Sequence, residues 1–251
     1  MTDRAEDLTR RLLLDAGIQE GMRVLDIGCG RGDVTILAAQ LVGPRGKVVG
    51  IDREQAPLEG GRARTSDLGL ANVSFERADL HTLPSEIGVF DAVIGRRVLM
   101  YQPDAVAALR HVANVLKPRG LIVLQEHDST SMPICAQEMP LHERVSSWIW
   151  DTVKHEGADV HMGLHLASAL VRAGYEVEHI RAEATILAPD QSHPIGTIVR
   201  AMLGRIVASG VATAEEIDID TLDARLIAER RETNGTCIWE MVFGAWARKP
   251  G

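Results

Sequence analysis

Cysteine and aromatic residues are scarce in this sequence of 251 residues. The first scarcity bears on the state of the thiols, and the second on the composition of the core. The three cysteines, Cys29, Cys135 and Cys237, are odd in number, lie far apart in the sequence and form no CxxC pair. This usage predicts reduced thiols and a cytoplasmic setting. Aromatic residues make up only 4% of the chain, so a core must be built from leucine, valine, isoleucine and alanine.

The sequence also lacks a run of lysine and arginine and any long apolar stretch. Its 27 basic residues against 35 acidic ones give a net charge of −8. An acidic chain of this kind binds nucleic acids and membrane surfaces poorly, so we expect a small-molecule partner. The sequence contains no run of 18 apolar residues, so we expect no membrane span. The N-terminal stretch lacks the apolar core of a signal peptide.

Short apolar strands alternate with amphipathic helices over the first 126 residues. Strands are expected at 23–27, 47–52, 72–79, 90–95 and 121–126, and helices at 6–16, 33–43, 54–70 and 104–120. The alternation predicts a doubly wound α/β fold with a parallel sheet and helices on both of its faces. Ligands of such sheets bind at the carboxyl ends of the strands.

The rhythm changes after residue 126. Helices are expected at 139–157 and 164–174 and strands at 175–183 and 236–249, and the capping box at Thr213–Glu216 starts one of two or three helices in 193–235. We expect one domain over 1–251, in which 1–127 bind a cofactor and 128–165 and 193–235 form a helical cap. An apolar stripe in the second cap segment (Ile198, Met202, Leu203, Ile206) predicts a cover over the acceptor or a contact between two copies in a homodimer.

The most informative stretch is VLDIGCGRGDVT, residues 24–35. Gly28, Gly30 and Gly32 allow the backbone to approach a ligand closely after a buried strand. A phosphate-binding P-loop is excluded because the lysine of GxxxxGK is absent, and Asp33 occupies the third glycine position of a dinucleotide fingerprint.

Acidic residues follow the expected strands around this turn. Asp52 ends the second strand, where ribose hydroxyls of a nucleotide would lie. Asp79 ends the third strand near the place of an adenine edge, and Asp26 lies in the first strand. Such a pocket suits a cationic nucleoside without phosphates, and S-adenosylmethionine meets that description.

With these elements, the chain resembles the class I S-adenosylmethionine-dependent methyltransferases. The matching segments, in the family's order, are VLDIGCGRG, VVGID, ADLHTLP, FDAVIGRRVLMY and LKPRGLIVLQE. The resemblance implies a Rossmann-like, seven-stranded and mostly parallel sheet, with an antiparallel last strand between the fifth and sixth. It implies S-adenosyl-L-methionine as cofactor. No metal is expected, because His161 and His165, the residues with the spacing of metal ligands, lack an HExxH pattern and a clear third ligand.

The resemblance also assigns cofactor contacts to residues of this chain. Gly28, Cys29 and Gly30 would pass close to the methionine part, with Asp26 near its ammonium group. Asp52 would accept both ribose hydroxyls, Asp79 and Leu80 would bracket adenine, and Arg96 would offer backbone contacts. Arg53 departs from the family's smaller or polar residue, and we expect it to point to solvent.

Candidates for proton transfer and acceptor binding lie beyond the fourth and fifth strands. His127 is the candidate general base, oriented by Glu126 or Asp128. His161 and His165 are four residues apart, a spacing that puts both on one face if a helix contains them. Further candidates for the acceptor pocket are Arg97, Met100, Tyr101, Met132 and Trp148, of which Trp148 at helical spacing also fits a packed core.

We therefore expect methyl transfer to a small organic acceptor, with secondary metabolism as one setting. Two alternatives stay open from the sequence alone. One is a nucleic-acid methyltransferase, which the net charge of −8 disfavours. The other is a cofactor-binding protein of this fold that no longer transfers methyl groups and serves as a scaffold or pericyclic catalyst.

Overall fold

The computed structural model describes residues 4–130, 133–191, 193 and 195–251 of the chain. These residues form two compact units. The first contains the chain up to Glu126 together with Met162–Arg181 and Phe243–Gly251, and the second contains His127–His161 and Ala182–Val242. The second unit includes most of the predicted cap segments. The single-domain organisation stays a prediction.

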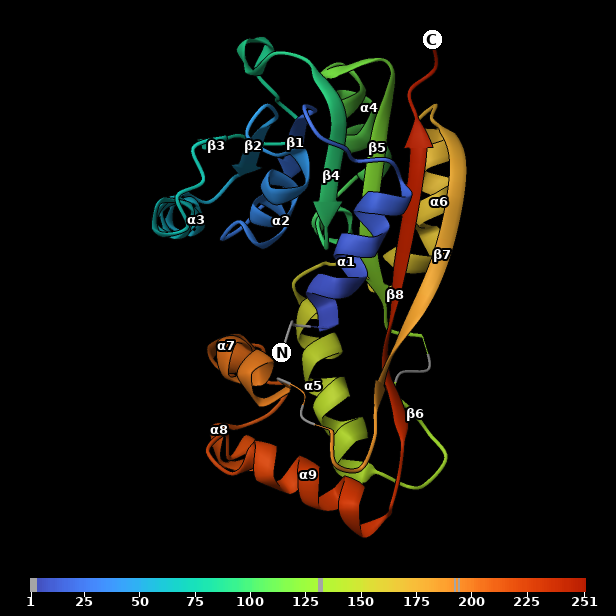
Figure 1. The fold of residues 1–251 in the computed structure, drawn as a ribbon. Coiled ribbons are helices and arrows are strands. Elements are labelled where there is room, and N and C mark those ends of the chain that lie inside the picture. Colours follow the sequence, from blue (N-terminus) through green and yellow to red (C-terminus); the bar gives the residue numbers. More distant parts are fainter. Residues whose placement is uncertain (1–3, 131–132, 192, 194) are drawn as a thin grey trace. The chain divides into compact units, whose positions relative to one another are not determined.

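A mixed sheet forms the centre of the first unit (Figure 1). The order of its eight strands is β3-β2-β1-β4-β5-β8-β6, with β7 also paired to β8. The strands are β1 (Arg23–Ile27), β2 (Lys47–Asp52), β3 (Val73–Arg77), β4 (Phe90–Arg96), β5 (Leu116–Asp128), β7 (Glu176–Leu187) and β8 (Cys237–Arg248). The first five pair in parallel, while β8 runs antiparallel to them between β5 and β7 (Figure 1). The Rossmann-like prediction is confirmed, including the inserted last strand.

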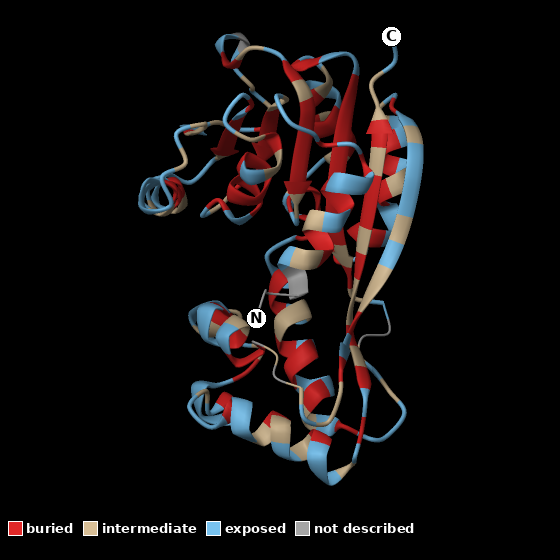
Figure 2. Cartoon of the chain, in the orientation of Figure 1, coloured by how far each residue is buried: buried red, intermediate tan, exposed pale blue. Residues whose placement is uncertain are grey.

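The central strands are apolar on both faces because helices cover them. The helices of this unit are α1 (Arg4–Asp15), α2 (Asp33–Val42), α3 (Gln55–Asp67), α4 (Ala105–Ala113) and α6 (Met162–Arg172), with short 3₁₀ turns η1 (Ser85–Ile87) and η2 (Leu99–Tyr101). Figure 2 shows β1, β4 and β5 as largely buried. Aliphatic side chains such as Leu25, Val93 and Ile122 make up this core, as the low aromatic content predicts.

One predicted helix is shorter than expected. Helix α4 ends at Ala113, and β5 already begins at Leu116, so the end of the predicted span at residue 120 was wrong. Pro118 lacks the N–H that a continuing helix needs. The strand instead contains an irregularity here, because Leu116 pairs with Phe90 and Leu121 pairs with Ala92.

The second unit is mainly helical. It contains β6 (Ile134–Cys135), an eighth strand that the sequence did not predict, and α5 (Pro140–His155), α7 (Ile195–Ala208), α8 (Ala214–Ile217) and α9 (Leu222–Glu232). Helices α7 and α9 both pack on α5. The capping box of α8 is present as predicted, with reciprocal bonds between Thr213 and Glu216.

The apolar stripe of α7 has a role within its own unit. Val199, Met202 and Ile206 are buried, whereas Ile198 and Leu203 are only half-buried. Since α7 packs on α5 and α9, the buried side chains belong to the core of this unit. Met202 and Ile206 of the predicted stripe thus pack inside this unit, and the cover over an acceptor or the contact between two copies stays a prediction.

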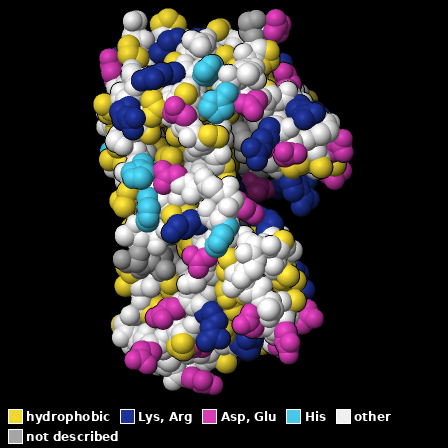
Figure 3. Space-filling model, turned by 180° about the vertical axis from the view of Figure 1, so that it is seen from behind, with side chains coloured by type: hydrophobic (Ala, Val, Ile, Leu, Met, Phe, Trp, Pro, Cys, Tyr) yellow, Lys and Arg dark blue, Asp and Glu magenta, His cyan; other side chains and the backbone are white. Residues whose placement is uncertain are grey.

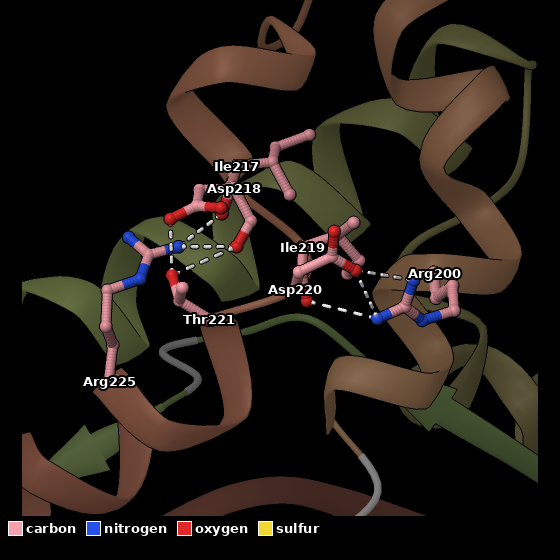
Figure 4. Close-up of polar contacts among 7 residues, drawn as sticks. All are labelled: Arg200, Ile217, Asp218, Ile219, Asp220, Thr221 and Arg225. Atoms are coloured by element: carbon pink, nitrogen blue, oxygen red, sulfur yellow. Dashed lines mark hydrogen bonds and ion pairs between the residues drawn. The ribbon is translucent and has the colours of Figure 1, made fainter.

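Several charged residues of the second unit bind partners within it. The acidic turn between α8 and α9 is an example, shown in Figure 4. Arg200 binds the Asp220 carboxylate at 3.2 Å, and Arg225 donates to the main-chain oxygens of Ile217 and Asp218 (Figure 4). The turn is thus held by arginines from α7 and α9.

A buried network joins α9 to the start of α5. The Glu229 carboxylate accepts from the backbone N–H groups of Leu141 and His142, at 2.8 and 3.0 Å. His142, fully buried, contacts Glu229 Oε2 through Nδ1 at 2.6 Å and Arg230 Nη1 through Nε2 at 2.7 Å. Because the guanidinium can only donate, Nε2 must accept and Nδ1 must carry the proton. His142 is therefore neutral here.

Surface charges of both signs are interspersed on the face shown in Figure 3. Among the described residues, no helix is long and apolar enough to cross a membrane.

Candidate cofactor site

The glycine turn after β1 is built for close backbone approach. Gly28, Gly30 and Gly32 all have positive φ, at 61°, 52° and 82°. A β-carbon added to Gly28 would lie 2.5 Å from Val98 Cγ2, and one added to Gly32 would lie 2.8 Å from Phe75 Cζ. Both conformation and space therefore require glycine at these two positions.

Asp52 joins this turn to the end of β2. Its Oδ2 accepts from the Gly30 N–H at 2.9 Å, and its Oδ1 accepts from the Glu54 N–H at 3.0 Å. These bonds fix the carboxylate while using only one position on each oxygen. Since a carboxylate offers about four acceptor positions, two remain for hydroxyl groups of a ligand.

A cavity of about 400 Å³ opens beside Asp52 at the carboxyl ends of β1, β2 and β4. It is lined by Gly28, Ile51, Asp52, Arg53, Glu54, Ala78, Asp79, Leu80, His81, Arg97, Val98, Tyr101, Gln102 and Pro103. The volume and the position at the carboxyl edge are those of a cofactor site in a parallel sheet.

The cavity brings together seven of the residues singled out in the sequence. Five are predicted cofactor contacts, and two, Arg97 and Tyr101, were assigned to the acceptor: Gly28, Asp52, Arg53, Asp79, Leu80, Arg97 and Tyr101. Arg53 is largely exposed, as expected, and its Nε lies 3.7 Å from Glu54 Oε1. His81, Val98 and Gln102 were not predicted as site residues; for Val98, the available signal was its place two residues after the end of β4.

Other predicted cofactor residues lie around the cavity without lining it. Asp26 is buried, accepts from Thr35 Oγ1 at 2.6 Å, and burial raises its pKa to about 7. Cys29 is also buried, and burial raises the pKa of its thiol. The Arg96 guanidinium lies 3.3 Å from Thr9 Oγ1 and 3.6 Å from Asp33 Oδ2.

A larger cavity of about 700 Å³ lies at the opposite edge of the sheet. It is lined by residues at the starts of β2 and β3, such as Lys47 and Val73, and by the end of α2. It contains none of the glycine-turn residues or of the acidic residues discussed above. Because ligands of parallel sheets bind at the carboxyl edge, the smaller cavity is the candidate site.

Comparison with known proteins agrees with this geometry. A family model described as a methyltransferase domain matches residues 18–184, about two thirds of the chain. The chain belongs to this methyltransferase-domain family. The resemblance to the class I S-adenosylmethionine-dependent methyltransferases is thereby confirmed.

The curated relatives match only part of this methyltransferase-family chain. Demethylmenaquinone methyltransferase of Staphylococcus aureus (strain JH9) is 36% identical over 133 residues, which are 53% of this chain and 54% of the relative. The match thus spans about half the length of the curated relatives.

Solved structures share the fold at lower identity. A putative methyltransferase of Bacillus halodurans C-125 has a TM-score of 0.65 at 17% identity, covering 97% of this chain and 99% of that one. The [4+2]-cyclase SpnF has a TM-score of 0.62 at 20% identity, covering 98% and 81%. Both likenesses show the fold alone.

His127 in this methyltransferase-family chain has a different partner from those predicted. Its Nδ1 lies 3.0 Å from Glu240 Oε2, and its side chain is 12% exposed. Glu240 also accepts from Thr185 Oγ1 at 3.4 Å. Orientation by Glu126 or Asp128 was wrong because neighbours in a strand point to opposite faces of the sheet.

The neighbouring acids have partners of their own. Glu126 accepts from the backbone of Val98 and Leu99, and Asp128 accepts from the Thr130 N–H at 2.8 Å. The predicted pairing missed Glu240, which lies more than a hundred residues further along the chain.

The remaining acceptor candidates are dispersed. His161 precedes α6 and belongs to the second unit, whereas the exposed His165 lies within α6 in the first, so the two do not share a helix face. His161 Nδ1 contacts Thr130 Oγ1 at 3.1 Å. Trp148 is buried on α5, Met100 is buried in η2, and Met132 lies outside the described residues.

Within the part of the chain that the structure describes, no cluster of three or more His, Cys, Asp or Glu side chains could hold a metal ion.

Proposed function

We propose that this chain transfers a methyl group from S-adenosylmethionine to a small organic acceptor. The observation that carries the proposal is Asp52, fixed against the glycine turn at the edge of a cavity of about 400 Å³. The relatives of this chain include a demethylmenaquinone methyltransferase, so a small-molecule acceptor has a precedent among them. The proposal includes secondary metabolism as a source of this acceptor.

The donor set fits the cofactor chemically. Asp52 has two acceptor positions left for the two ribose hydroxyls. Asp79 and Leu80 line the same cavity, where a polar edge and an apolar face suit adenine. Gly28 lines the cavity as well, and it must be glycine because a β-carbon there would meet Val98.

When bound, S-adenosylmethionine supplies an electrophilic methyl group on a positively charged sulfur. The protein's part is to bind the two reactants and align them for an in-line displacement, which can supply much of the rate enhancement. If the acceptor must lose a proton, His127 is the candidate base, and Glu240 would hold its Nδ1–H so that Nε2 can accept. Arg97 can bind a carboxylate or phosphate of the acceptor from its place in the cavity wall.

The alternatives differ in what happens to the methyl group. A [4+2]-cyclase shares the fold, so the fold does not by itself require methyl transfer. A nucleic-acid methyltransferase is disfavoured by the net charge of −8. A cytoplasmic setting and a homodimer remain further parts of the proposal, the first resting on three free cysteines.

Incubation with methyl-labelled S-adenosylmethionine tests the proposal. A low-molecular-weight metabolite extract and purified RNA should be supplied in parallel reactions. We expect label only in products of the metabolite fraction. Label in RNA would support the nucleic-acid alternative, and cofactor binding without transfer to either fraction would support the protein that no longer methylates.

A further inference from the structure

Near its carboxyl end, β5 contains a buried carboxylate, Glu126. Glu126 is fully buried in the first unit. Its Oε1 accepts from the Val98 N–H at 3.0 Å and from the Leu99 N–H at 2.7 Å. Its Oε2 is buried with no hydrogen-bond partner among the described residues.

These bonds hold the start of η2, which no local side chain caps. Val98 occupies the N-cap position, and its side chain makes no capping bond. Glu126 therefore takes the place of a cap from 27 residues away. The main chain needs this support because Arg97, directly before it, has a left-handed φ of 54°.

The segment held in this way forms one wall of the cofactor cavity. Five cavity-lining residues belong to it: Arg97, Val98, Tyr101, Gln102 and Pro103. Val98 also packs where a side chain on Gly28 would lie, 2.5 Å from such a β-carbon. Glu126 is thus linked through Val98 to the glycine turn.

We propose that Glu126 is a positioning residue for the cofactor, acting through the 97–103 segment. The inference rests on the proposed function, because it assumes that S-adenosylmethionine occupies this cavity. Burial raises the pKa of Glu126 to about 7, while the N–H groups of Leu99, Val98 and Met100 and the charge of Arg97 oppose that rise. The cost of burying this acid is consistent with a task beyond packing.

Two substitutions separate the loss of the hydrogen-bond acceptor from the loss of its charge. Glu126→Leu removes the acceptor for both N–H groups, and we expect binding of S-adenosylhomocysteine to weaken roughly ten- to hundredfold. Glu126→Gln keeps one oxygen but loses the charge and places an NH₂ where Oε2 lies. Since charge-assisted bonds are about twice as strong as neutral ones, we expect an intermediate loss of roughly three- to tenfold when binding is measured well above pH 7, where Glu126 is ionised.

Gln125→Leu is the matched control from the same strand. The side chain of Gln125 is also buried but accepts from Thr9 Oγ1 at 2.7 Å; its contact with the 97–103 segment is made by its backbone oxygen, which accepts from the Arg97 N–H and is kept in the variant. This variant should lose stability in thermal denaturation yet bind S-adenosylhomocysteine within about twofold of the parent. Hydrogen–deuterium exchange should accelerate at 97–103 in both Glu126 variants and remain unchanged there in the control.

The outcomes decide the inference separately from the proposed function. If the parent chain does not bind S-adenosylhomocysteine, the proposed function fails. If the parent binds and folded Glu126→Leu binds equally well, only the inference fails, and equal weakening by Gln125→Leu would overturn it too. Should Glu126→Leu not fold, parent-like affinity in Glu126→Gln would overturn it.

Discussion

Backbone N–H groups, rather than other side chains, are the main partners of Asp52 and Glu126, two carboxylates that support the candidate site. Asp52 accepts from Gly30 and Glu54, and Glu126 accepts from Val98 and Leu99. Such bonds fix main-chain segments on two sides of one cavity. Asp52 could be predicted because it follows the second strand at the spacing of a nucleotide site, whereas nothing in the sequence marks the partners of Glu126.

His127 and Glu240 allow a test at the level of single residues. If His127 is the general base, His127→Ala should lower acceptor turnover by about 10²–10⁴-fold, with cofactor affinity nearly unchanged. Glu240→Gln should cause a smaller loss in the same direction, because the amide can still bond to the ring but no longer stabilises its charge. Steady-state and single-turnover kinetics with an identified acceptor would measure both.

Thr185→Val is the control for this pair, since it removes a second contact of Glu240 and should leave the rate near that of the parent. A His127→Ala enzyme within about threefold of the parent, with chemistry shown to limit the rate, would refute the role of His127 and leave alignment as the main source of catalysis.

At the level of elements, hydrophobic periodicity predicts the βα alternation well but not the ends of elements. The strands β1, β2 and β4 lie within one residue of their predicted bounds. The end of α4 differed because apolar residues such as Val115 and Leu116 continue past the helix into the sheet. Strand β6 is only two residues long, too short to show a period.

Helices α5 and α9 provide an element-level prediction of pH dependence. Burial lowers the pKa of His142 below its ordinary value of 6.5, and the charge of Arg230 lowers it further, against the bond to Glu229. The unfolded chain therefore binds a proton here more readily than the folded one. The contribution of His142 to the free energy of unfolding is fully present above pH 6.5. It should decrease as the pH drops from 6.5 towards the lower pKa of the folded state.

His142→Gln isolates this effect, because glutamine can donate to Glu229 and accept from Arg230 without titrating. Denaturation followed by tryptophan fluorescence should show that the loss of stability between pH 7 and 5 is smaller in this variant than in the parent. His155→Gln, at an exposed histidine of the same helix, should behave like the parent. An identical pH profile for parent and His142→Gln would show that the network does not resist protonation.

For the whole molecule, the sequence predicted the cofactor half far better than the rest. The glycine turn, Asp52 and Asp79 follow strands that are adjacent in the chain's order, so local spacing is enough to bring them to one edge. The pairs Glu229–His142 and Glu240–His127 join segments far apart in the sequence. No periodicity reports such contacts, because only the folded chain brings the segments together.

The central claim is that S-adenosylmethionine is held in the cavity beside Asp52, and calorimetric titration with S-adenosylhomocysteine tests it most directly. The parent chain should bind this ligand and should not bind NAD, since Asp33 replaces the third fingerprint glycine. Asp52→Ala should weaken binding roughly ten- to hundredfold through the loss of two charge-assisted bonds, whereas Asp67→Ala, at an exposed acid of α3, should not. Unchanged affinity in a folded Asp52→Ala variant would contradict the account.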